Sequence, residues 1–236
     1  ALLGAAAPAA WAQPVAGKTL RVSFPIAETG FDPQAVGDAY SNYVNRAIFD
    51  PLYRYDYLAR PYKLIPNTAT GMPVISADGK TWTIHVRKGI YFADDPVFKS
   101  ARRELTAADY AFAIKRILDP RMRSNSLQMV DGRFVGADAL VAKAKETGRF
   151  DYDAPFEGVQ AIDRYTLQFK LVFADYELLS NLTTTALSAV AREVIDVAIH
   201  RLVDAEQHVD RPVEQVRRFA DHVRDRHVGG QAQRLP

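Results

Sequence analysis

The chain has 236 residues, of which 48% are hydrophobic and 25% charged, so it can bury one large core or two smaller ones. Its 30 basic and 28 acidic side chains give a net charge of +2, which predicts no general attraction to nucleic acid or anionic lipid, so partners must be inferred from local features. The absence of cysteine excludes disulfides, thiolate nucleophiles, iron–sulfur clusters and thiolate zinc sites.

The N-terminus has the features of an export signal. Residues 1–12, ALLGAAAPAAWA, are small and apolar and end in the Ala-x-Ala pattern that signal peptidase cleaves. We interpret them as a signal peptide remnant, which predicts export and a mature chain that begins at Gln13. No apolar run approaches the roughly 20 residues needed to cross a bilayer, so we expect a soluble protein without a membrane span.

A strand and a helix are predicted next. Residues 19–24 alternate between apolar and polar side chains, as in a strand, and this pattern stops at Pro25. Residues 38–49 have apolar residues at helical spacing, and Asp38 can cap the first turn. Pro51 follows and ends this helix, because proline is not tolerated in a helix interior.

A tyrosine-rich extended stretch, PLYRYDYLARPY, covers residues 51–62. Together with the preceding helix it gives a group of six rings: Tyr40, Tyr43, Tyr53, Tyr55, Tyr57 and Tyr62. Such rings could line a sugar or peptide cleft. Buried aromatic side chains in strands are the commoner explanation, so we expect these rings to be buried.

The segment DGKTWTIHVRKGIYF, residues 78–92, has the period-2 pattern of a strand with one buried face. Trp82, Ile84 and Val86 are predicted to enter a core, with His85 on the outer face. His85 could instead act as a general base, but it has basic neighbours and no nearby carboxylate to orient it. We therefore expect His85 to be solvated.

Two helices and another strand are predicted beyond residue 100. Thr106 and Asp109 form a capping-box-like start to a helix at 106–118. Its apolar face consists of Tyr110, Phe112, Ala113, Ile114, Ile117 and Leu118. A second helix is expected at 137–147 and an alternating strand at 165–171. Helices mixed with antiparallel hairpins predict an α+β fold.

Motifs typical of enzymes are scarce. The chain has no G-x-S-x-G, H-E-x-x-H or G-x-G-x-x-G motif, so acyl transfer, zinc hydrolysis and dinucleotide binding have no local support. Asp94 and Asp95 could form an acid–base pair, although adjacent loop acids are usually solvated. We expect no enzyme, cofactor or metal site. A small secreted hydrolase that uses His85 with these two acids is the alternative of another class.

Four segments, in order, carry a resemblance to a known family. They are TLRV with the following FDP at 19–33, RAIFDPLYRYD at 46–56, DGKTWTIHVRKGIYF at 78–92 and LTAADYAFAIKRILDP at 105–120. They resemble the extracellular solute-binding proteins of family five, the dipeptide- and oligopeptide-binding receptors of ABC importers. The resemblance runs from about residue 18 to 196. The insertion ADDPVFKSARRE at 93–104 departs from it, because most members have a short aspartate-glycine loop there.

The resemblance implies a fold like the type II periplasmic binding proteins, with two lobes that close over an extended peptide. It assigns residues 13–39 and 173–196 to lobe I, and residues 40–172 to the extra domain II. The segment from 78 to 92 would then be a hairpin of domain II.

The resemblance also implies a ligand-binding loop made of Glu28, Thr29, Gly30 and Phe31. This loop corresponds to the family segment that touches the ligand backbone. A carboxylate at Glu28 could accept peptide N–H groups, and Gly30 would allow close approach. Glu28 could equally be an ordinary exposed loop acid.

The function implied is that of the substrate-binding subunit of an ABC peptide importer. We expect a periplasmic monomer whose partners are a peptide ligand and the membrane subunits of the importer, and no nucleic acid. Nickel complexes, heme or oligosaccharide, which other members bind, are the alternative ligands.

Beyond residue 196 nothing resembles the family. Residues 197–236 hold four of the five histidines and seven arginines but no lysine, although lysine is frequent earlier. A natural domain boundary could explain this shift, but a changed reading frame or a gene fragment is favoured. The four histidines lack the i,i+4 spacing of a helical zinc site. We therefore expect an incomplete receptor that does not bind peptide tightly by itself.

Overall fold

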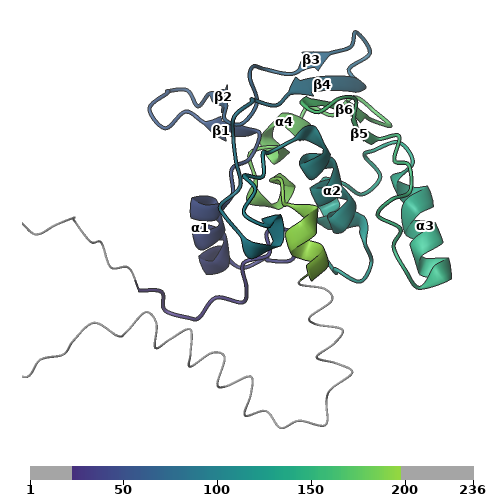
Figure 1. Cartoon of the computed structure of the whole chain (residues 1–236). Coiled ribbons are helices and arrows are strands. Elements are labelled where there is room, and N and C mark those ends of the chain that lie inside the picture. Colours follow the sequence, from purple (N-terminus) through teal and green to yellow (C-terminus); the bar gives the residue numbers. More distant parts are fainter. Residues whose placement is uncertain (1–22, 198–236) are drawn as a thin grey trace, which may run out of the picture.

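A four-stranded antiparallel sheet and one long helix organise the computed structural model, which describes residues 23–197 (Figure 1). The strand order is β3-β4-β6-β5. The strands are β3 Val74–Ile75, β4 Thr81–His85, β5 Val159–Ala161 and β6 Thr166–Lys170, and the helix α2, Ala107–Leu118, packs against β5 and β6. The helices and antiparallel strands confirm the predicted mixed fold.

The two central strands form the core as their side-chain pattern predicts. In the register of β4 and β6, Trp82 lies opposite Phe169 and Ile84 lies opposite Leu167. These four side chains are at most 4% exposed. His85 is exposed, so the predicted faces of the strand are confirmed.

A tight turn joins β3 to β4 at Asp78 and Gly79. The Asp78 carboxylate accepts hydrogen bonds from the Ser76 hydroxyl and the Lys80 N–H. Gly79 has a φ of +73°, which glycine adopts without strain. This turn fixes the hairpin that the Asp-Gly pair indicates in the sequence.

Helix α2 begins with the predicted capping box. The backbone N–H and the hydroxyl of Thr106 both donate to the Asp109 carboxylate, over 2.7 Å and 2.8 Å. All six residues of the predicted apolar face are buried. The helix ends before Asp119, whose following Pro120 cannot continue it.

Helices α1 and α3 lie where their sequence patterns place them. Helix α1, Ala39–Ile48, starts at Asp38, whose carboxylate accepts from the Ser41 N–H over 2.8 Å. Helix α3, Ala137–Thr147, lies between Gly136 and Gly148, both with positive φ. Shorter helices are η1 Pro96–Phe98, η2 Leu127–Met129, α4 Leu178–Asn181 and η3 Thr185–Leu187.

The strands β1, Tyr53–Tyr55, and β2, Leu64–Pro66, form a separate two-stranded sheet. We call residues 53–66 the tyrosine arm, because it projects from the body of the molecule (Figure 1). The expectation that the six tyrosines are buried is wrong for four of them. Tyr53, at the base of the arm, is fully buried and Tyr40 is half-buried, whereas Tyr43, Tyr55, Tyr57 and Tyr62 are 57%, 48%, 87% and 77% exposed. Tyr55, Tyr57 and Tyr62 lie on a hairpin outside the main sheet, where no second layer within residues 23–197 covers them, whereas Tyr43 lies on an exposed side of α1.

Several expectations fall wholly or partly outside the described residues. The signal peptide remnant at 1–12, the processing site before Gln13 and the tail beyond residue 197 are among them. Of the strand expected at 19–24, only Ser23 and Phe24 are described, and neither lies in a strand. Between residues 23 and 197, no helix is long and apolar enough to span a membrane.

Candidate ligand-binding site

The predicted ligand loop, residues 28–31, is fastened to the first turn of α1. The Thr29 N–H donates to the Ser41 hydroxyl over 2.9 Å, and the Thr29 hydroxyl donates to the Asp38 carboxylate over 2.5 Å. Hydrogen bonds from Ser41 and Thr29 hold the pKa of Asp38 at about 2, so its carboxylate stays ionised at neutral pH. The loop is therefore held in place by a charged helix cap.

The remaining residues of this loop face outward. Glu28 is exposed, and its carboxylate has no hydrogen-bond or ion-pair partner among residues 23–197. Gly30 is half-buried, and Phe31 is 45% exposed. Both interpretations of Glu28, a ligand acceptor and an ordinary surface acid, are compatible with this placement, so its role stays a prediction.

An apolar cavity of about 470 Å³ begins at Phe31. Its walls come from the end of α1 and from the segments 90–98 and 189–195, and include Ile48, Phe49, Ile90, Phe92, Phe98, Val190 and Ile195. Asp94 and Asp95 also line it, and Asp95 accepts from the Val97 N–H over 2.9 Å as the cap of η1. The insertion 93–104 therefore forms a wall beside the predicted ligand loop.

A second, more polar cavity of about 760 Å³ lies along α1. Amide and hydroxyl side chains from separate segments line it, including Asn42, Asn67, Asn125, Gln128 and Thr185. Phe49 and Asp50 border both cavities, so the two meet at the C-terminal end of α1. No sequence motif indicated this cavity, because only the fold brings its walls together.

A buried arginine joins the ligand loop to the core. Arg116 of α2 is 2% exposed and forms an ion pair with Asp32 over 2.5 Å. It also donates to the Gln34 side chain, whose amide in turn donates to the Ala186 carbonyl over 3.0 Å. The residues that directly follow the ligand loop are thus connected to α2 and to η3, and such buried ionic contacts require this close pairing.

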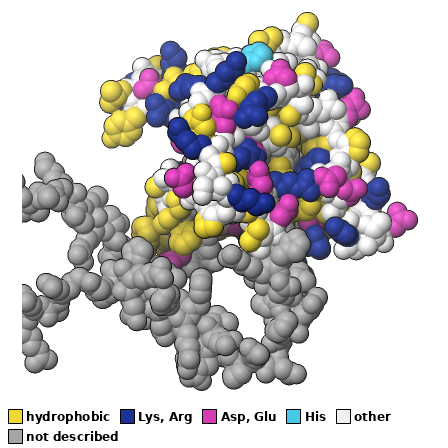
Figure 2. Space-filling model, in the orientation of Figure 1, with side chains coloured by type: hydrophobic (Ala, Val, Ile, Leu, Met, Phe, Trp, Pro, Cys, Tyr) yellow, Lys and Arg dark blue, Asp and Glu magenta, His cyan; other side chains and the backbone are white. Residues whose placement is uncertain are grey.

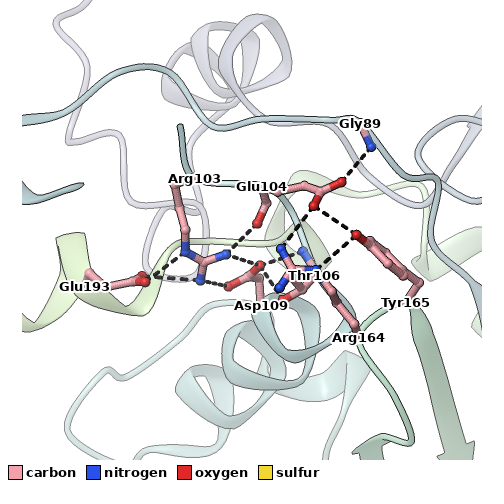
Figure 3. A network of polar contacts seen from close by, with 8 residues as sticks. All are labelled: Gly89, Arg103, Glu104, Thr106, Asp109, Arg164, Tyr165 and Glu193. Atoms are coloured by element: carbon pink, nitrogen blue, oxygen red, sulfur yellow. Dashed lines mark hydrogen bonds and ion pairs between the residues drawn. The ribbon is translucent and has the colours of Figure 1, made fainter. Parts of the chain in front are cut away.

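A second polar network fastens the insertion 93–104 to α2 (Figure 3). Arg103 lies between Asp109 and Glu193, at 2.6 Å and 2.8 Å, and its hydrogen bond lowers the pKa of Glu193. The adjacent Glu104 accepts from the Gly89 N–H and the Tyr165 hydroxyl, over 2.8 Å and 2.9 Å. Sequence reasoning missed this network, because its members are spread from residue 89 to residue 193.

The residues of the hydrolase alternative do not form a common site. His85 shares a hydrogen bond with the Thr166 hydroxyl at 3.2 Å and lines neither of the two cavities, whereas Asp94 and Asp95 border the apolar one. The expectation that no carboxylate lies near His85 needs correction. A backbone hydrogen bond from Tyr165 is the main reason why the pKa of Asp163 is lowered, and the charge of His85 contributes to the same shift.

Metal binding has no support in the described part of the chain. Among residues 23–197, no three histidine, aspartate or glutamate side chains are grouped so that they could hold a metal ion.

Comparisons with known proteins identify a family. Residues 63–213 match the middle part of family 5 of the bacterial extracellular solute-binding proteins, so the match continues past residue 196, where the resemblance was expected to end. The chain is 30% identical over 203 residues to the di/tripeptide-binding protein 2 of Pseudomonas aeruginosa, covering 84% of this chain and 34% of that protein. It is 29% identical to the dipeptide-binding protein of Escherichia coli, covering 77% of this chain and 31% of that protein. The chain thus spans about a third of these relatives.

Solved structures show the same fold. The pheromone receptor PrgZ, described with its mode of peptide binding, matches with a TM-score of 0.57 at 25% identity, over 72% of this chain and 30% of that one. The periplasmic binding protein DppA of Helicobacter pylori, in complex with the peptide STSA, matches with a TM-score of 0.54 at 24% identity, over 74% and 31%. From the family match and the curated relatives, we conclude that the chain belongs to family 5 of the bacterial extracellular solute-binding proteins.

Proposed function

We propose that this chain provides one wall of the peptide-binding cleft in the substrate-binding subunit of an ABC importer, and that this subunit works in the periplasm as a monomer. The proposal is supported by the family and by relatives that are named as dipeptide- or tripeptide-binding proteins. Binding is by reversible closure of the cleft and involves no chemical step.

The observation that carries the proposal is the exposed carboxylate of Glu28, which has no partner within residues 23–197 and lies on a fixed loop beside an apolar cavity. An extended peptide presents backbone N–H donors together with side chains, so it needs both an acceptor and apolar space. A hydrogen bond from a peptide N–H to an ionised carboxylate is among the stronger kinds in proteins. Phe31 offers an apolar surface at the cavity, and Gly30 before it has no side chain that would keep a peptide backbone away.

Peptide binding by the 236 residues alone should be weak. The chain spans about a third of its relatives, so a peptide bound to it is contacted from one side only. Each lost charge-assisted hydrogen bond is worth about 1.5–3 kcal/mol. The loss of two or three such bonds changes a micromolar complex into a millimolar or weaker one. Apolar surface left open at the cavity should also favour aggregation.

Calorimetric titration of the 236-residue chain with a pool of dipeptides to pentapeptides tests this proposal. We expect binding in the millimolar range, and peptides that mass spectrometry finds intact after incubation. Micromolar binding would show that a second wall is not needed. Peptide cleavage that is lost in His85→Ala would favour the hydrolase instead.

Two matched variants and three other ligands complete the design. Glu28→Gln should weaken peptide binding, whereas Glu146→Gln, an exposed residue of α3, should leave it unchanged. Equal effects of the two variants would remove Glu28 from the site. Nickel complexes, heme and an oligosaccharide are titrated in parallel, and tighter binding of one of them would reassign the ligand class.

A further inference from the structure

The tip of the tyrosine arm exposes an unusual amount of apolar surface. Tyr57, Leu58 and Tyr62 are 87%, 81% and 77% exposed. In the space-filling view, hydrophobic side chains stand beside dark blue cationic ones at the position of the arm, at upper left (Figure 2). Single exposed apolar residues are common on proteins, but a group at the tip of a projecting hairpin points to an interaction.

The arm presents these side chains in a defined arrangement. The strand pairing continues past β1 and β2, since the Asp56 N–H donates to the Lys63 carbonyl over 2.7 Å. The Arg60 guanidinium donates to the carbonyls of Tyr57 and Ala59, over 3.2 Å and 2.8 Å. The rings of Tyr55 and Tyr62 meet edge to face, with centroids 5.9 Å apart. The hairpin is therefore already ordered, so that binding through it should cost little conformational entropy.

The arm is also locally cationic. It holds Arg54, Arg60 and Lys63 against the single acid Asp56, so its net charge is three minus one, or +2. Asp56 accepts a hydrogen bond from the Leu58 N–H over 3.0 Å. Within residues 23–197, the side chains of Arg54 and Lys63 form no ion pair. This short hairpin therefore carries as much net positive charge as the whole chain, which is also +2.

We propose that the tyrosine arm is a membrane-docking element that binds the surface of an anionic lipid bilayer, a role beyond the proposed peptide binding. Tyrosine rings favour the headgroup region, where the ring is shielded and the hydroxyl stays hydrated. Leu58 enters the boundary with the acyl chains, and the cations attract the lipid phosphates. A second copy docked through the same arm is disfavoured, because two hairpins that each carry a net charge of +2 repel one another.

Co-sedimentation of the 236-residue chain with lipid vesicles tests the proposal. Binding should rise when phosphatidylglycerol is added to phosphatidylcholine vesicles, and it should fall with salt. Arg54→Gln combined with Lys63→Gln should lower the partition coefficient about 25-fold, or fivefold for each charge. Tyr57→Ser combined with Leu58→Ser should also lower it. Tyr176→Ser, at a residue that is 93% exposed outside the arm, is the matched control and should leave it unchanged.

Fluorescence distinguishes the arm from other occupants and other membrane-binding segments. The unmodified chain, whose Trp11 and Trp82 also emit, serves as the reference. Relative to it, Tyr57→Trp should show an additional shift to shorter wavelength when anionic vesicles are added, whereas Tyr176→Trp should show none. Arm variants that bind vesicles as well as Tyr176→Ser does would overturn the proposal. So would a shift of Tyr57→Trp that needs no vesicles and depends on protein concentration, which would indicate a second copy. Binding to polyglutamate without binding to vesicles would indicate an acidic protein instead.

Discussion

Replacing Trp82 by alanine should destabilise the fold by about 4 kcal/mol. The indole is 4% exposed, lies opposite Phe169 in β6 and Ile75 in β3, and donates to the Gly79 carbonyl over 2.9 Å. Truncation of a buried aromatic side chain to alanine costs about 3–5 kcal/mol. With a urea m-value of about 2 kcal/mol/M, the unfolding midpoint should fall by about 2 M.

The matched control is His85→Ala on the same strand. Its side chain is exposed and shares only the hydrogen bond with Thr166, so its loss should change stability by less than about 0.5 kcal/mol. Urea unfolding is best followed by far-UV circular dichroism, because Trp82 is itself a fluorescent probe. A larger loss in His85→Ala than in Trp82→Ala would show that the faces of β4 are inverted.

Three further predictions concern polar contacts. Asp109→Asn should lower the unfolding free energy by about 2 kcal/mol, because it weakens the ion pair with Arg103 and the cap of α2. An unchanged midpoint of urea unfolding would show that these two contacts add no stability. Tyr110→Phe should cost about 1 kcal/mol, since the hydrogen bond to the Thr68 hydroxyl at 2.6 Å is lost, and a neutral result would show that this bond adds no stability. The pKa of Asp38 is about 2 in the fold against an ordinary 3.8, so its contribution is complete above pH 3.8 and is lost as pH falls through 2. In Asp38→Asn, the unfolding free energy should therefore change less between pH 3.8 and pH 2 than in the unmodified chain. An equal change in both proteins would contradict this.

The regular elements could be predicted from the sequence, because their signals are local. The alternation around Trp82 and the cap residues Thr106 and Asp109 depend only on neighbours within a few positions. The burial of Trp82 and of the apolar face of α2 then follows from the packing of α2 against the four-stranded sheet. The family resemblance rested on the same segments, and the family match confirms it.

Features that depend on distant residues could not be predicted. The partners of Arg103 lie at positions 109 and 193, and the walls of both cavities come from segments separated by more than a hundred residues. The tyrosines were misjudged for a related reason. Their alternation resembles that of a core strand, but only the fold determines whether a second layer covers the side chains, and within residues 23–197 no such layer covers Tyr57.

The placement of Glu28–Phe31 at a peptide site is tested most directly by amide spectroscopy. A tripeptide is titrated into the ¹⁵N-labelled chain at millimolar concentrations, and the shifts of the Thr29 and Gly30 amides are followed. We predict saturable shifts at these two amides that Glu28→Gln weakens and Glu146→Gln does not. Shifts that are absent from this loop, or that are the same in both variants, would contradict the account.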